Sequence, residues 1–202
     1  MSEGTGESAR DEIRAAALTL FSSIGFHGTG IRRIAQEAGV SLATLYHYMS
    51  SKEDLLVEEM TENIQSLVRD ARAELQGRID PVDRLRALVG VHLATHIRDR
   101  MVCIVSDTEM RSLSPASRTQ VVALRDEYES QWRSVVDAGV KAGDFSVEDV
   151  NIATKALLDM CTGIVHWYSP DGRLGQEDLT EMYVELCLGM LGAHSRSSGD
   201  ES

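Results

Sequence analysis

The sequence has few residues that interrupt helices and few that favour strands. Its 202 residues include only three prolines and 5% aromatic side chains, and alternating runs of β-branched residues are nearly absent. Ala, Leu, Glu, Arg and Met are frequent, and all of them favour helices. The composition therefore argues against a sheet-based fold and predicts an all-α protein, long enough to bury a sizeable core as one domain or two small ones.

Two further absences concern the compartment. No early stretch joins basic residues to an apolar run and a cleavage site, so no signal peptide is predicted. No apolar run approaches the roughly 18 residues of a membrane-spanning helix, so we expect no membrane partner. The three cysteines, Cys103, Cys161 and Cys187, cannot all pair within one chain. Together these features predict a reduced, cytoplasmic protein.

An excess of basic residues is also absent, since the net charge is −12. That total alone would argue against nucleic acid, but the charge is distributed unevenly along the chain. Residues 8–55 hold five basic and five acidic groups, whereas residues 56–202 hold fifteen basic and twenty-five acidic groups. The neutral N-terminal part can therefore approach a polyanion that the acidic remainder repels.

Apolar residues spaced by three and four predict about nine helices between two short polar ends. Ser8, Ser41 and Ser146 can cap helices, and the Asp80-Pro81 and Ser114-Pro115 pairs are helix starts because proline suits the first helical position. The expected helices cover about residues 8–24, 31–37, 42–48, 51–75, 81–93, 101–113, 115–142, 147–168 and 179–191.

The stretch from Arg32 to Leu56 reads RRIAQEAGVSLATLYHYMSSKEDLL. It contains two short helical segments joined by Ala-Gly-Val-Ser, where Gly39 can take the left-handed conformation that turns the chain. Such a pair predicts a helix-turn-helix, whose second helix enters the major groove of DNA. The alternative is that Tyr46 and Tyr48 are core aromatics of a small bundle.

Hydroxyls, an imidazole and small apolar groups suit phosphates, base edges and thymine methyls, and guanidinium and ammonium groups suit phosphates. The predicted DNA-binding residues are Thr29, Arg32, Arg33, Ser41, Leu42, Ala43, Thr44, Tyr46, His47 and Lys52.

Residues 8–60 resemble the TetR family of one-component transcriptional repressors. The matched positions are Gly25, Thr29, Ile34-Ala35, Ala38-Gly39-Val40-Ser41, Thr44-Leu45-Tyr46, Tyr48 and Ser51-Lys52-Glu53-Asp54-Leu55. The resemblance implies a DNA-binding head over residues 8–54, with the helix-turn-helix at about 30–49, and a ligand-binding and dimerising body over residues 55–194. Residues 1–7 and 195–202 are expected to be disordered tails.

Two positions depart from the family pattern. Gly30 stands where a serine or threonine is usual, so a hydroxyl contact to phosphate is either missing or supplied by Thr29. Met49 stands where a phenylalanine is usual and can fill the same space. The resemblance also implies that Lys52, at the start of a helix, holds a phosphate, and both an ammonium and a helix N-terminus favour an anion.

The body is expected to bind a small-molecule effector. His92 and His96 have the i, i+4 spacing of metal ligands, but no carboxylate or cysteine motif accompanies them, so no metal and no cofactor are predicted. Cys161 and Cys187 lie on apolar stripes and are expected to be core residues. The predicted effector-binding residues are His92, His96, Arg111, Arg125, Trp132, Cys161 and His166.

The effector class rests on a looser resemblance. Trp132, Gly139, Gly143 and Phe145, followed by the run from Trp167 to Gly172, look like the branch of the family that represses fatty-acid and steroid-side-chain degradation. That branch responds to acyl-CoA thioesters, whose phosphates would pair with arginines of the body. The alternatives are core packing for this pattern, and a hydrophobic drug or aromatic metabolite as the effector.

The last two helices carry more apolar residues than one internal face needs, which suits a four-helix dimer interface. The predicted interface residues are Ala156, Met160, Ile164, Trp167, Met182, Leu186 and Leu191.

The sequence therefore predicts a dimeric repressor that an effector releases from a palindromic operator. A helical adaptor that binds only protein is the alternative of another class. An enzyme is not predicted, because no Ser-His-Asp order, phosphate loop or paired carboxylates are recognisable.

Overall fold

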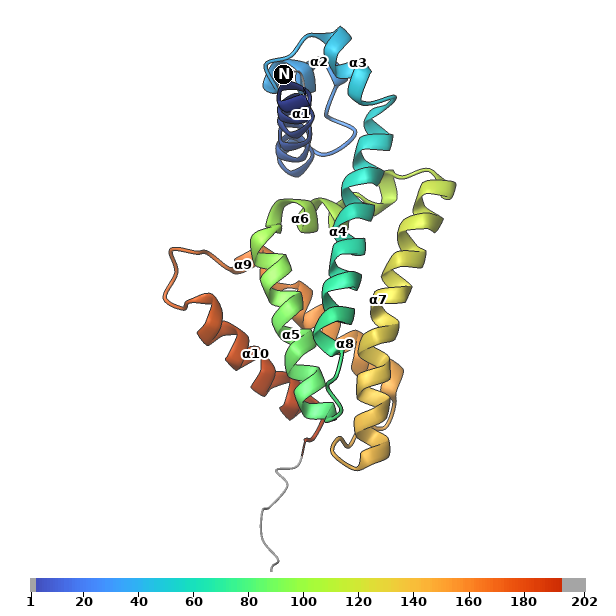
Figure 1. Cartoon of the computed structure of the whole chain (residues 1–202), viewed down its shortest axis with the longest axis vertical. Coiled ribbons are helices and arrows are strands. Elements are labelled where there is room, and N and C mark those ends of the chain that lie inside the picture. Colours follow the sequence, from blue (N-terminus) through green and yellow to red (C-terminus); the bar gives the residue numbers. More distant parts are fainter. Residues whose placement is uncertain (1–2, 194–202) are drawn as a thin grey trace, which may run out of the picture. The chain divides into compact units, whose positions relative to one another are not determined.

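The structure is a computed structural model that describes the backbone of residues 3–193 and the side chains of residues 9–193. The predicted C-terminal tail and the first two residues of the predicted N-terminal tail lie outside the described residues. The described chain is all-helical, with ten α-helices and one 3-10 helix, η1 (Figure 1). None of the helices within this range is long and apolar enough to span a membrane.

The helices follow the chain in this order: α1 (Glu3–Ile24), α2 (Ile31–Glu37), α3 (Leu42–Tyr48), α4 (Lys52–Leu75), α5 (Pro81–Arg98), α6 (Arg100–Thr108), η1 (Met110–Ser112), α7 (Pro115–Ala142), α8 (Val150–Thr162), α9 (Ile164–Trp167) and α10 (Gln176–Met190). The number exceeds the expected nine because two expected helices are each interrupted, one between α6 and η1 and one at Gly163. The helix α1 begins at Glu3, where Ser8 was the expected cap. The expected cap at Ser146 is wrong, since α8 is capped by Asp149, whose carboxylate accepts from the backbone N–H groups of Asn151 and Ile152.

The chain divides into two compact units, the first formed by residues 1–65 and 99–124 and the second by residues 66–98 and 125–202. The helices α4 and α7 each contribute to both units. The head boundary expected after Asp54 falls inside the first unit, so that boundary stays a prediction.

The first unit is organised by α1. This helix packs against α2 and α6 and buries Ile13, Ala17 and Phe21, as the spacing of its apolar residues predicted. Ile24, the last residue of the predicted stripe, is exposed instead. Gly25 then ends the helix with a φ of 77°, which a residue with a Cβ adopts only at a cost.

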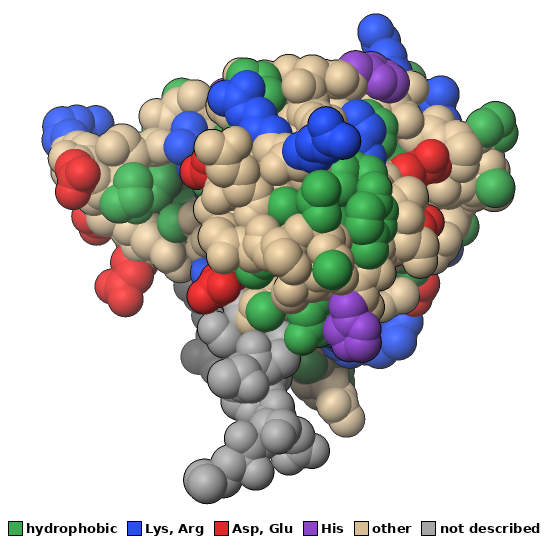
Figure 2. Space-filling view, turned by 90° about the horizontal axis from the view of Figure 1, so that it is seen from above, with side chains coloured by type: hydrophobic (Ala, Val, Ile, Leu, Met, Phe, Trp, Pro, Cys, Tyr) green, Lys and Arg blue, Asp and Glu red, His purple; other side chains and the backbone are tan. Residues whose placement is uncertain are grey.

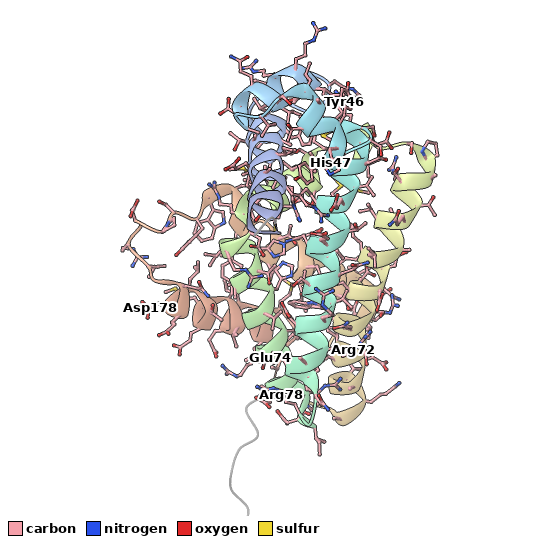
Figure 3. The ribbon with its side chains drawn as sticks, turned by 45° about the horizontal axis from the view of Figure 1, so that its top comes forward. Tyr46, His47, Arg72, Glu74, Arg78 and Asp178 are labelled. Atoms are coloured by element: carbon pink, nitrogen blue, oxygen red, sulfur yellow. The ribbon has the colours of Figure 1, made fainter. Side chains whose placement is uncertain are left out.

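In the second unit α10 packs against α5 and α8, and Leu88, Leu93 and Leu157 are fully buried there. The turn between α4 and α5 is held by Arg78, whose guanidinium donates to both oxygens of Asp83 at 3.0 and 2.9 Å and to the Glu74 carboxylate at 3.2 Å. Figure 3 labels Glu74 and Arg78 at this turn.

The tryptophan-glycine pattern has a structural explanation at its glycine end. The helix α7 ends where Gly143 takes a φ of 77°, and the chain folds back so that the Phe145 N–H donates to the Gly139 carbonyl at 3.2 Å. A Cβ on Gly139 would lie 2.0 Å from the Phe145 ring, and that ring is buried. Gly139 is therefore required by a close approach within the core.

We predict that Gly139→Ala lowers the free energy of unfolding by about 1–3 kcal/mol, because the added methyl overpacks the Phe145 site. Gly90→Ala is the matched control, since a Cβ there meets no atom within 4 Å, and it should stabilise the helix by about 0.5–1 kcal/mol. Denaturant unfolding measures both changes. Equal stability of the two variants would contradict the close approach.

Candidate functional site

The helices α2 and α3 form a helix-turn-helix with the predicted bounds. Gly39 has a φ of 66°, and the Val40 N–H donates back to the Ala35 carbonyl at 3.0 Å. Ser41 caps α3, because its hydroxyl accepts from the Thr44 N–H at 3.0 Å. The predicted left-handed turn and the predicted cap are both confirmed.

Most of the predicted DNA-binding side chains are exposed on these two helices. Ile34 and Leu45 are fully buried, which fixes the opposite faces of the helices outward. Tyr46 is 56% exposed and projects with His47 from α3 (Figure 3), so it is not a core aromatic. The other exposed members of the set are Arg32, Arg33, Ser41, Leu42 and Ala43, with Thr44 half-buried.

The hydroxyls of Ser41 and Thr44 lie 2.8 Å apart and hydrogen-bond to each other. This bond orients two polar groups at the start of α3, the part of a recognition helix that meets base edges in a helix-turn-helix. On the face drawn in Figure 2, Lys and Arg side chains lie along one side of a hydrophobic patch, and the same face also shows His, Asp and Glu side chains. The surface can therefore offer cations, hydroxyls and apolar contacts together.

Thr29 requires a correction. Its side chain is 1% exposed, and its hydroxyl donates to the Gly25 carbonyl at 2.8 Å. The hydroxyl thus closes the turn between α1 and α2 and does not replace the hydroxyl that Gly30 lacks. Gly30 caps α2 without a side-chain hydrogen bond.

Lys52 has partners within the protein, and its predicted phosphate contact stays a prediction. Its ammonium donates to the carbonyls of Phe26 at 2.7 Å and Thr29 at 3.0 Å, and it lies 4.2 Å from the centroid of the Phe26 ring. Two of its three protons therefore point into the protein. The first turn of α4 also carries Glu53 and Asp54, which oppose an anion at this helix end.

Two arginines of α1 are neutralised within the first unit. Arg10 pairs with Glu58, and Arg14 pairs with Glu59 and Glu62, all on α4. Burial raises the pKa of the Glu59 carboxyl, although its bond to Arg14 acts in the opposite direction. The net charge of zero in this part of the chain thus includes cations that already have partners.

In the second unit His92 lies at the centre of a buried polar cluster. Its Nδ1 lies 3.1 Å from the Tyr128 hydroxyl and its Nε2 lies 3.2 Å from the Thr162 hydroxyl. The His96 ring stacks on it at 3.8 Å between centroids, and the Trp132 ring stands edge-on at 5.6 Å. Both nitrogens of His92 are thus committed within the protein.

Burial favours the neutral forms of His92 and Tyr128. It lowers the pKa of His92 well below its ordinary value, and the nearby His96 acts in the same direction. Burial also raises the pKa of the Tyr128 phenol. The indole N–H of the fully buried Trp132 has no acceptor in hydrogen-bonding geometry. The cluster therefore contains one neutral donor without a hydrogen-bond acceptor.

The other predicted effector residues are not among the partners that contact His92. His166 is exposed on α9, and Arg111 lies on η1 in the first unit. Arg125 is half-buried on α7, one turn before Tyr128. Cys161 is a core residue as predicted, with its sulfur 3.9 Å from that of Cys187.

Tyr128 and Thr162 were missed at the sequence level. A signal for Tyr128 existed, since it stands four residues before Trp132 and hence on the same face of one helix. Thr162 gave no such signal, because its partner is seventy residues away in the chain.

The predicted interface residues fall into two groups. Ile164 and Leu191 are fully buried core residues, which corrects their assignment. Trp167, Met182 and Leu186 are about half-exposed, with Met160 half-buried and Ala156 exposed. Ile152 and Met190, which were not predicted, add to the exposed apolar surface of α8 and α10. On α10 this surface borders an open groove of about 740 Å³ lined in part by Leu174, Met182 and Leu186.

Two family models match the chain. The one described as bacterial regulatory proteins, tetR family, matches residues 13–58. The one described as tetracyclin repressor-like, C-terminal domain, matches residues 78–191, which is more than half of the chain.

Individual proteins match over nearly the whole length. The HTH-type transcriptional repressor KstR2 of Mycolicibacterium smegmatis is 29% identical over 197 residues, covering 96% of this chain and 94% of that protein. The structure of the TetR family transcriptional regulator PfmR from Thermus thermophilus is 31% identical with a TM-score of 0.80, covering 91% of this chain and 99% of that chain. AibR in complex with isovaleryl coenzyme A and operator DNA is 25% identical with a TM-score of 0.77, covering 91% and 97%.

The buried His92 predicts a pH dependence of stability. His92 stays neutral in the folded chain, whereas in the unfolded chain it binds a proton below its ordinary pKa of 6.5. Its contribution to stability is therefore fully present above about pH 6.5 and falls as the pH decreases, by at most about 1.4 kcal/mol per pH unit. His92→Gln should flatten the pH dependence of the unfolding midpoint below pH 6.5. The exposed His166→Gln should not, and the same flattening in both variants would contradict the assignment.

Proposed function

Because the chain belongs to the TetR family of bacterial regulatory proteins, we propose that it acts as a dimeric repressor which an acyl-CoA thioester releases from a palindromic operator. The chain is a DNA-binding transcriptional repressor of this non-enzymatic family. The dimer, the symmetry of the operator and the class of effector are the proposal.

The surface of α3 carries the DNA-binding part of the proposal. Tyr46 and His47 are exposed on a helix whose start is fixed by the Gly39 turn and the Ser41 cap. Arg32 and Arg33 are exposed on α2 and make no ion pair within the described chain. Base edges would be read by the side chains of α3, and phosphates would be bound by the arginines of α2.

The apolar surface of α8 and α10 supports the dimer. Ile152 on α8, Leu186 on α10 and Trp167 on the short helix α9 are each more than half exposed, and side chains of this kind gather on surfaces that a partner covers. Pairing α8 and α10 of two protomers would bury them in a four-helix interface. Two heads related by a twofold axis would then bind two half-sites of inverted sequence.

The effector class is supported by the polar cluster and by one relative. A neutral, aromatic environment suited to an apolar chain is formed by His92, Tyr128 and Trp132. Arg125 lies on α7 one turn before Tyr128. AibR was solved with isovaleryl coenzyme A and operator DNA together. We propose that the acyl group meets the cluster while Arg125 pairs with a phosphate of the CoA.

We predict that Tyr46→Ala weakens binding to a DNA duplex selected by the wild-type protein from a random pool by at least about tenfold, because it removes a side chain from the recognition surface. Tyr168→Ala, in the loop after α9, is the control and should leave the affinity unchanged. Selected sequences should show inverted symmetry with half-sites spaced by whole helical turns. Selected sites without such symmetry would exclude the proposed dimeric binding.

For the effector, we predict that medium- and long-chain acyl-CoA thioesters release this DNA, whereas the matching free acids and CoA alone do not. Arg125→Gln should raise the thioester concentration needed for release by about tenfold, since it removes a charge-assisted contact. Arg69→Gln, an exposed arginine on α4, is the control. Release by free acids but not by thioesters would refute the acyl-CoA assignment and leave the repressor assignment standing.

A further inference from the structure

The backbone N–H and C=O of Phe26, in the turn that joins α1 to α2, are each bonded to a charged side chain. The N–H donates to the Glu109 carboxylate at 3.1 Å, and the carbonyl accepts from the Lys52 ammonium at 2.7 Å. An anion thus accepts from the backbone donor of Phe26 and a cation donates to its backbone acceptor, so the two peptide groups that flank Phe26 are both held, each by a bond stronger than one between neutral groups.

Both charged groups are themselves held in place. The second oxygen of Glu109 accepts from the Ser112 hydroxyl at 2.6 Å, and Glu109 is the residue at which α6 ends. Lys52 begins α4, lies over the Phe26 ring, and also donates to the Thr29 carbonyl at 3.0 Å. The contacts therefore tie the turn to the start of α4 and the end of α6, which are distant from it in sequence but lie in the same compact unit.

The turn has little freedom to move without breaking these bonds. Gly25 is in the left-handed conformation, and a Cβ on it would lie 3.5 Å from the Glu109 carboxylate. The Phe26 ring is buried and lies 5.3 Å from the Phe21 ring, centroid to centroid. Gly30, the cap of α2, follows four residues after Phe26. The backbone conformation of this turn therefore sets the direction of the α2 axis.

We propose that Glu109, Phe26 and Lys52 form a clamp that positions the helix-turn-helix for DNA binding, and that Lys52 acts through this clamp instead of binding a phosphate. Lys52 and Glu109 are positioning residues in this proposal, since neither needs to touch DNA. The ammonium is already shared between two carbonyls, and a phosphate would have to compete with both.

The salt dependence of binding separates the two roles of Lys52. A residue that binds a phosphate contributes about one unit to the slope of log affinity against log salt, whereas a positioning residue does not contribute. We compare Lys52→Met, which keeps a long side chain over Phe26, with Arg33→Gln on the same selected duplex. Each removes one positive charge.

The clamp predicts that Lys52→Met lowers affinity about tenfold or more with an unchanged salt slope, while Arg33→Gln lowers the slope by about one unit. A slope that falls by about one unit in Lys52→Met would overturn the proposal and establish a phosphate contact.

For Glu109 the clamp and long-range electrostatics predict opposite changes in DNA affinity. Removing a negative charge from a DNA-binding protein raises affinity when only long-range electrostatics act, and Glu37→Gln, on an exposed residue of α2, should do so. Glu109→Ala should instead lower affinity about tenfold, and Glu109→Gln, which keeps an oxygen acceptor, should restore part of it. Higher affinity in Glu109→Ala would overturn the clamp.

The double variant and hydrogen exchange complete the test. If both side chains act on one turn, Lys52→Met and Glu109→Ala together should lose little more affinity than the weaker-binding single variant, whereas independent losses would multiply. Amide exchange should accelerate in residues 25–30 of each single variant and stay unchanged in α5 and α8. Multiplied losses, or faster exchange throughout α5 and α8, would overturn the proposal.

Discussion

The turn after α1 is the constraint on which the DNA-binding end of the chain depends. A turn that reverses direction between two helices leaves backbone groups without helical partners, and such groups need partners when they are buried. Here Thr29, Lys52 and Glu109 supply them from within the turn, from α4 and from the end of α6. Because α2 starts from this turn, the placement of α3 follows from contacts made by residues up to about eighty positions away.

The parts of the fold that depend on local signals were predictable from the sequence. The bounds of α2, α3 and α7 follow from Gly39, Ser41 and Pro115, and each of these residues acts on its own backbone neighbours. The roles of Thr29 and Lys52 were not predictable in the same way. Both residues could be expected near DNA by family resemblance, but their actual partners are carbonyls whose position exists only after the turn has folded.

Local sequence signals also could not show which apolar residues of the C-terminal helices are buried and which are exposed. A helix that is apolar on several faces has a periodicity that does not say which face enters the core. Ile164 and Leu191 are buried while Ile152 and Met190 are exposed, and the choice is made by packing of α10 against α5 and α8. Ile164, the first residue after the interruption at Gly163, lies on α9, which packs against α5 and α8.

The small number of unpaired cations on the predicted head makes DNA affinity depend strongly on how the head is oriented. Arg10 and Arg14 pair with carboxylates of α4, and Lys52 is bonded to carbonyls, so few cations of the predicted head remain directed outward. When few cations bind phosphates, DNA affinity depends more on the contacts of α3 with base edges. Hydrogen bonds to base edges are sensitive to direction. An acidic protein with a nearly neutral head can therefore recognise DNA only if the head is held in a defined orientation. This requirement is why the bonds from Glu109 and Lys52 to the backbone of Phe26 matter for function.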